Sequence, residues 1–79
     1  MKIPVIKKLV ENHSLEELTA AEEALSEERG AAIEITGDDE GEKLTHAFAA
    51  MWIKERVNQG EDFKVALRAY TQMVRQSIS

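Results

Sequence analysis

The chain has 79 residues and a formal net charge of −5, from 10 Lys and Arg against 15 Asp and Glu. It contains no cysteine, which excludes disulfides, thiolate-bound metals and thiol nucleophiles. The acidic balance argues against nucleic acid as a partner, and the longest uncharged apolar run, Ala47–Ile53, is far shorter than the roughly 20 residues that cross a membrane. These limits favour a single cytoplasmic domain over residues 1–79.

Residues 4–12 are predicted to form a short first helix. Pro4 suits the first turn of a helix, because its missing N–H would have no intrahelical partner there. The apolar residues that follow recur at helical spacing and define one face: Ile6, Leu9 and Val10. A helix of this length is marginal alone in water, so we expect it to pack against the rest of the chain.

Residues 15–29 are predicted to form the second helix. Ser14 and Glu17 have the spacing of a capping box, in which the serine hydroxyl accepts the N–H of Glu17 and the carboxylate accepts the N–H of Ser14. One apolar face follows, made by Leu15, Leu18, Ala21 and Leu25. Gly30 is expected to end the helix, because glycine commonly stands just beyond a helix C-terminus.

Residues 32–36 are predicted to be extended. Ile33 and Ile35 are β-branched and alternate with Glu34, which is the period-two pattern of a strand. The rest of the chain has helical patterns, so this segment has no partner strand of its own. It either pairs with the same segment of a second chain or lies over the core as extended chain.

Residues 40–59 are predicted to form the central helix. Asp39 and Glu42 repeat the cap spacing, and Gly60 stands just after the expected last turn. The centre of this helix, Ala47–Ile53, is apolar around its whole circumference, which is typical of a helix buried on more than one face. We therefore expect the other helices to surround it.

Residues 63–77 are predicted to form the fourth helix, which begins after Asp62. Its apolar stripe is the most regular in the chain: Phe63, Ala66, Leu67, Tyr70, Met73, Val74 and Ile78. The four helices together predict an all-α protein, a compact bundle of four helices with one short extended segment near 32–36.

The acidic turn 38–42 is the first candidate for a functional site. Asp39, Glu42 and His46 are spaced at i, i+3 and i+7, so they share one helix face. Two carboxylates and an imidazole suit a divalent metal ion, which gives the chain an alternative function as a metal-binding protein. The same residues are also explained by an acidic helix N-terminus and a histidine with local hydrogen bonds.

Ser14 is the second candidate, as a site of covalent modification. The pair Ser14-Leu15 resembles the Asp-Ser-Leu motif of acyl carrier proteins, which are acidic four-helix proteins of about this length. The resemblance implies a phosphopantetheine group on Ser14. His13 stands where that family has aspartate, and the capping box gives Ser14 a competing structural role.

No catalytic residue and no cofactor is predicted. The chain has two histidines and shows neither a glycine-rich phosphate loop nor a nucleophile motif. A helical chain this short leaves little room for a deep pocket. The leading hypothesis is therefore a small non-catalytic interaction or assembly protein.

We predict that the chain forms a homodimer, with another protein as a further possible partner. A domain of this size without disulfides buries little apolar surface by itself. Residues 11–42 hold twelve acids and one Arg, and the chain beyond them is net basic, so the second helix of one copy can meet Arg68 or Arg75 of another. We expect Trp52 and Ile53 near the contact, because Trp is enriched at interfaces.

The chain as a whole resembles a small family of uncharacterised bacterial proteins of similar length. The resemblance is carried by three segments, which are Ile3–Val10, Ser14–Leu18 and Ile33–Glu42. It extends over nearly the full length and implies no activity, cofactor or site residue.

Overall fold

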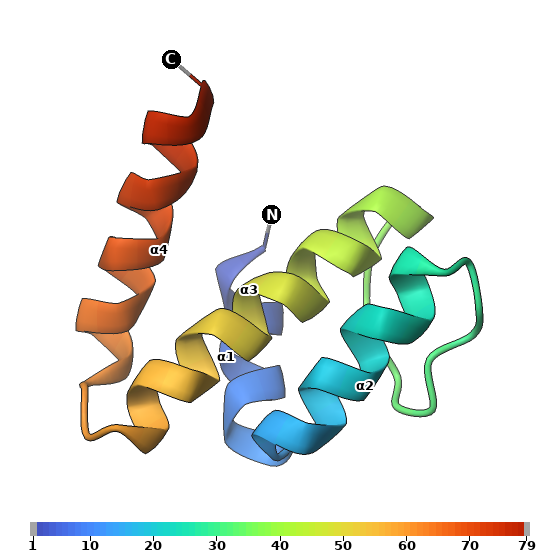
Figure 1. The fold of residues 1–79 in the computed structure, drawn as a ribbon, viewed down its shortest axis with the longest axis horizontal. Coiled ribbons are helices and arrows are strands. Elements are labelled where there is room, and N and C mark those ends of the chain that lie inside the picture. The colour runs from blue at the N-terminus through green and yellow to red at the C-terminus, as the bar shows by residue number, and fades with distance from the viewer. Residues whose placement is uncertain (1, 79) are drawn as a thin grey trace.

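The structure is a computed structural model that describes residues 2–78. Within this range the chain forms four helices, α1 (Ile3–Asn12), α2 (Leu15–Ser26), α3 (Glu40–Asn58) and α4 (Phe63–Ile78), as Figure 1 shows. The predicted all-α bundle of four helices is confirmed. The helix α3 is central, because α1, α2 and α4 each pack mainly against it. None of the described helices is long and apolar enough to cross a membrane.

The N-termini of α2 and α3 form as the sequence predicts. The Ser14 hydroxyl accepts the N–H of Glu17 at 3.1 Å, and the Glu17 carboxylate accepts the N–H of Ser14 at 2.9 Å. At α3, Asp39 Oδ1 accepts the N–H of Glu42 at 2.7 Å. Each contact satisfies a backbone donor that has no partner inside the helix.

The C-terminus of α2 differs from the prediction. The helix ends at Ser26 and not at residue 29, because Glu28 adopts a left-handed backbone with φ of 61°. The N–H groups of Glu28 and Arg29 then turn back to the carbonyls of Leu25 and Ala24 at 3.1 and 2.7 Å. This is the geometry that glycine usually supplies, and here a glutamate supplies it.

The C-terminus of α3 uses the same geometry with the predicted glycine. Gly60 has φ of 101°, and its N–H donates to the carbonyl of Val57 at 3.0 Å. The next N–H, from Glu61, donates to Arg56 O at 3.1 Å. The prediction that Gly60 follows the last turn of this helix is confirmed.

The segment that joins α2 to α3 is a loop that returns to the start of α3 at the same end of the molecule (Figure 1). No β-strand is present among the residues that the structure describes. Ile35 is buried in the core and Ile33 is partly buried against it, whereas Glu34 between them is exposed. The alternation of the isoleucines therefore reflects one-sided burial of an irregular segment, which is the second of the two arrangements considered for residues 32–36.

Alanines, together with His46 and Ile53, form the face of α3 that meets α1 and α2. His46, Ala47, Ala50 and Ile53 lie on this face and are fully buried, with Ile6 of α1 and Leu18 of α2 against the same core. Alanine lets neighbouring helices approach closely and still exclude water. The face opposite, which includes Phe48, faces away from this core.

The helix α4 packs on α3 through its N-terminal half and then diverges from it (Figure 1). Ala66 and Tyr70 are buried, and Met73 and Val74, further along, are only partly buried. Ile78, the last residue of the predicted stripe, lies outside the described side chains. The C-terminal end of α4 therefore stands apart from the other three helices.

Candidate functional site

His46 links three separate parts of the chain. Its ring is fully buried. Nε2 accepts the backbone N–H of Lys2 at 2.9 Å, and Nδ1 lies 2.7 Å from the carbonyl oxygen of Thr36. Because Nε2 accepts, the ring proton is on Nδ1 and is donated to Thr36. Both nitrogens are therefore engaged in holding the start of α1 and the loop before α3 against α3.

The structure brings Asp39 and Glu42 together but does not bring His46 to them as a shared metal site. Asp39 caps α3, and Glu42 Oε1 accepts the N–H of Asp38 at 2.8 Å. Among the residues that the structure describes, no group of three or more His, Cys, Asp or Glu side chains is placed to bind a metal ion. The geometry agrees with the capping explanation of these residues, in which the carboxylates complete the first turn.

The partners of His46 lie too far away in sequence for local spacing to reveal them. Lys2 precedes it by 44 residues and Thr36 by ten. The sequence signal that indicates such a role is a histidine next to a run of alanines, because an imidazole buried among them needs hydrogen-bond partners from elsewhere in the chain.

Ser14 is exposed at the start of α2, and its hydroxyl oxygen takes part in the capping box. The N–H of Ser14 donates to Glu17, and this hydrogen bond lowers the pKa of the Glu17 carboxyl, with a further contribution from His13. His13 Nδ1 lies 3.8 Å from Glu17 Oε2. The residues around Ser14 thus form one local cap at the junction of α1 and α2.

The two residues predicted for a chain–chain contact occupy different environments. Ile53 is fully buried inside its own chain, because it lies on the face of α3 that meets α1 and α2. Trp52 is partly buried, and its ring lies 5.6 Å from the ring of Tyr70 between centroids. The guanidinium of Arg56 lies 4.9 Å from the centroid of the Trp52 ring, and Arg56 also pairs with Glu61. Of the two, only Trp52 has a surface that a second chain can reach.

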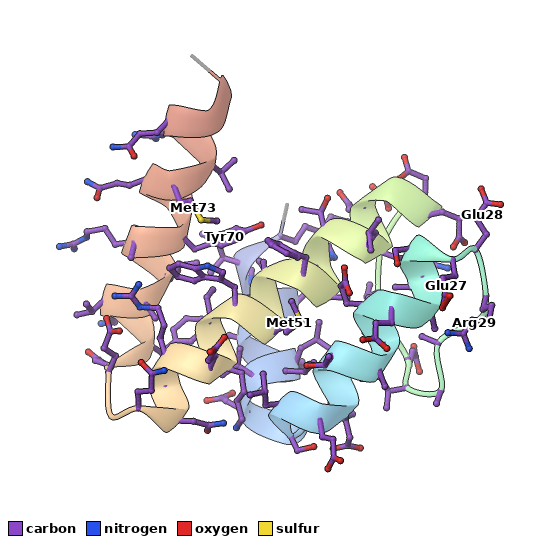
Figure 2. All side chains as sticks on the ribbon, in the orientation of Figure 1. Glu27, Glu28, Arg29, Met51, Tyr70 and Met73 are labelled. Carbon is purple, nitrogen blue, oxygen red and sulfur yellow. The ribbon has the colours of Figure 1, made fainter. Side chains whose placement is uncertain are left out.

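An apolar stripe runs along the face of α3 opposite the buried alanines. We call it the outer stripe, and its members recur at helical spacing: Leu44, Phe48, Met51 and Trp52. Phe48 is 37% exposed, and its ring lies 6.2 Å from that of Tyr70. In Figure 2, Met51 lies on α3 toward α2, and Tyr70 and Met73 project from α4 toward α3. Burial of Tyr70 beside this stripe raises the pKa of its phenol.

The helices that flank α3 carry opposite charge. The basic residues of α4 are Lys64, Arg68 and Arg75, and α4 has no acidic residue. The acidic residues of α2 are Glu16, Glu17, Glu22 and Glu23, and α2 has no basic residue. Figure 1 shows that α2 and α4 lie on different sides of α3, so these charges do not meet within one chain.

A surface hollow lies between α1 and the loop before α3. It encloses about 420 Å³ and opens widely to solvent, and its lining includes Val5, Leu9, Lys8, Glu34 and Thr36. This volume falls in the range of small-molecule sites, so the short chain offers more concave space than its length suggests. Its charged side chains, Lys8 and Glu34, are exposed.

Fold and surface together define a small all-α protein built around one central helix, with an apolar stripe on that helix and oppositely charged helices beside it. The chain belongs to a family of unknown function, DUF6952, whose model matches residues 1–79. The family resemblance inferred from the sequence is confirmed to that extent. No curated protein and no solved structure matches the chain.

Proposed function

We propose that this protein is a small non-catalytic interaction and assembly protein that binds a protein surface through the outer stripe of α3 and the adjoining face of α4. The observation that carries the proposal is the outer stripe itself. Phe48 is one of three large hydrophobic residues exposed in residues 2–78, and it continues into Met51, Trp52 and the apolar face of α4. Apolar surface that is continuous in this way is a mark of protein interaction sites.

The polar residues that the sequence singled out support the same proposal. Ser14 and Asp39 cap helices, and His46 joins three segments of the fold. These side chains are engaged in holding the structure and do not compete with the outer stripe as a functional surface. The proposal includes a cytoplasmic location in a bacterial cell, which cell fractionation of the source organism tests.

A photo-crosslinking residue placed at Phe48 in the full-length chain tests the proposed function in the source cell. We expect a protein adduct from position 48 and none from the matched position Lys7, which is exposed on α1. The absence of an adduct at position 48, or equal adducts at both positions, would contradict the proposal.

A further inference from the structure

The outer stripe leaves one side of α3 without a covering helix. The helix is apolar all round between Ala47 and Ile53, and the three other helices cover its alanine face and one flank. Phe48 remains 37% exposed, and Met51 and Trp52 remain partly exposed. A helix with an apolar face can cover this stripe.

The chain itself carries a helix of that kind. The helix α4 has 16 residues and is therefore about 24 Å long at the usual rise of an α-helix. Its C-terminal half extends beyond its contact with α3, and Met73 and Val74 are only partly buried there (Figures 1 and 2). A stable dimer needs about 800 Å² from each partner, so the contact has to include the outer stripe as well as the free part of α4 in each copy.

Charge favours a second copy over an unrelated helix. Lys64, Arg68 and Arg75 are exposed on α4, and none of them forms an ion pair within the described residues. The same holds for Glu16, Glu22 and Glu23 of α2, which flanks the outer stripe. A second α4 placed along the stripe beside α2 brings these two unpaired sets together. Opposite charges of this kind steer association and set orientation.

We infer that two copies of the chain form a two-fold symmetric dimer in which α4 of each copy lies along the outer stripe of the other, next to its acidic α2. The inference rests on the proposed function, because it names the partner of the same surface. The two-fold axis makes the contact reciprocal, so each stripe is covered and each α4 is packed on two sides.

Sedimentation equilibrium of the full chain at micromolar concentration tests the inference. We expect a species of twice 8.9 kDa, and we expect Phe48→Glu to weaken the dimer by about 30-fold or more, as loss of a buried aromatic anchor does. The matched control is Ile3→Glu, because Ile3 is 47% exposed at the start of α1, outside the proposed contact, and its replacement should leave the dimer intact. Circular dichroism of both variants verifies that the monomer fold is kept.

Charge exchange tests the orientation separately. Arg68→Glu should weaken the dimer, and added salt should then strengthen the association of this variant, because salt screens the new repulsion. Adding Glu22→Lys to this variant should restore association in part. A dimer that ignores Phe48→Glu, or one that Arg68→Glu leaves unchanged, overturns the proposed packing.

The failure of this inference can be distinguished from the failure of the proposed function. A chain that stays monomeric, with position 48 crosslinked to a different protein in the cell, overturns the second copy as partner and leaves the interaction surface standing. A monomer with no adduct at position 48 overturns both.

Discussion

Glu17 is the residue whose charge state is tied most directly to folding. Its pKa lies below the ordinary carboxyl value, first because its carboxylate accepts the N–H of Ser14. A carboxyl with a lowered pKa in the folded state stabilises the fold above the unfolded-state pKa, and that contribution is lost as pH falls through the folded-state pKa.

We therefore expect the free energy of unfolding to decline below about pH 4.5, the ordinary value for this carboxyl, and Glu17→Gln to remove part of that decline. Urea unfolding followed by circular dichroism across the acid range measures both. Glu16→Gln removes a neighbouring charge outside the capping box and should keep the decline. An acid profile of Glu17→Gln identical to that of the wild type would rule out this role for Glu17.

Two residues with positive φ provide a matched pair of backbone substitutions. Glu28 adopts the left-handed conformation after α2, and Gly60 adopts a positive φ after α3. Left-handed backbone is unfavourable for a residue with a Cβ and costs glycine little. Glu28→Gly removes the cost of the left-handed backbone but adds the greater freedom of glycine in the unfolded chain. We expect the net effect to raise the free energy of unfolding by about 0.5–1 kcal/mol.

Gly60→Ala should lower the free energy of unfolding by about 1–2 kcal/mol, because the added Cβ meets a strained backbone although no atom lies within 4 Å of it. Urea unfolding of both variants at neutral pH gives the two values. Changes of the same sign in the two variants would contradict the conformational explanation.

At the scale of the elements, His46 is what fixes the start of α1 and the loop before α3 to the central helix. His46→Ala leaves the Lys2 N–H and the Thr36 carbonyl without their hydrogen-bond partner and creates a cavity at a fully buried position. We expect a loss of about 2–4 kcal/mol in the free energy of unfolding.

Hydrogen exchange of the Lys2 amide separates this linking role from simple loss of volume. In His46→Gln, the side-chain carbonyl can still accept the Lys2 N–H, so protection of that amide should be retained in part, and in His46→Ala it should disappear. Equal exchange of Lys2 in the two variants would show that the histidine acts only by filling space.

The helices could be predicted from the sequence because their signals are local. Apolar periodicity, the capping residues Ser14 and Asp39, and Gly60 after α3 all act within one or two turns. The end of α2 was missed because Glu28 occupies a position that sequence patterns assign to glycine. The environment of His46 was missed because it depends on contacts that form only when distant segments come together.

The outer surface of α3 was predicted only in part for a similar reason. A helix that is apolar all round does not reveal which of its faces is buried, and the structure buries the alanine face with Ile53 and leaves Phe48 exposed. Trp52 lies at the edge between α3 and α4, with its ring against Tyr70. The contact of a second chain at Trp52 stays a prediction.

At the scale of the whole molecule, the structure consists of three helices with a shared core and a fourth that is attached along half its length. The helices α1, α2 and α3 share one buried core, to which α4 adds Ala66 and Tyr70 from its first half, and Lys54 of α3 also donates to the Val10 carbonyl at 3.0 Å near the end of α1. The C-terminal half of α4 has fewer buried residues to hold it. Regions of this kind open at lower free energy than the core.

We expect this division to be visible in amide hydrogen exchange of the full chain. In dilute solution the amides of Thr71 to Gln76 should exchange through local opening, much faster than those of Ala47 to Ile53 on the central helix. When the concentration is raised to about 100 times the dimer dissociation constant, about one chain in 15 stays monomeric, so protection of the α4 amides should increase by about 15-fold, because binding stabilises the closed helix. The Phe48→Glu variant should lose this dependence on concentration and keep the slow exchange of α3. Slow exchange of the α4 amides at every concentration would mean that α4 is held by its own chain, which would contradict its stabilisation by a second copy.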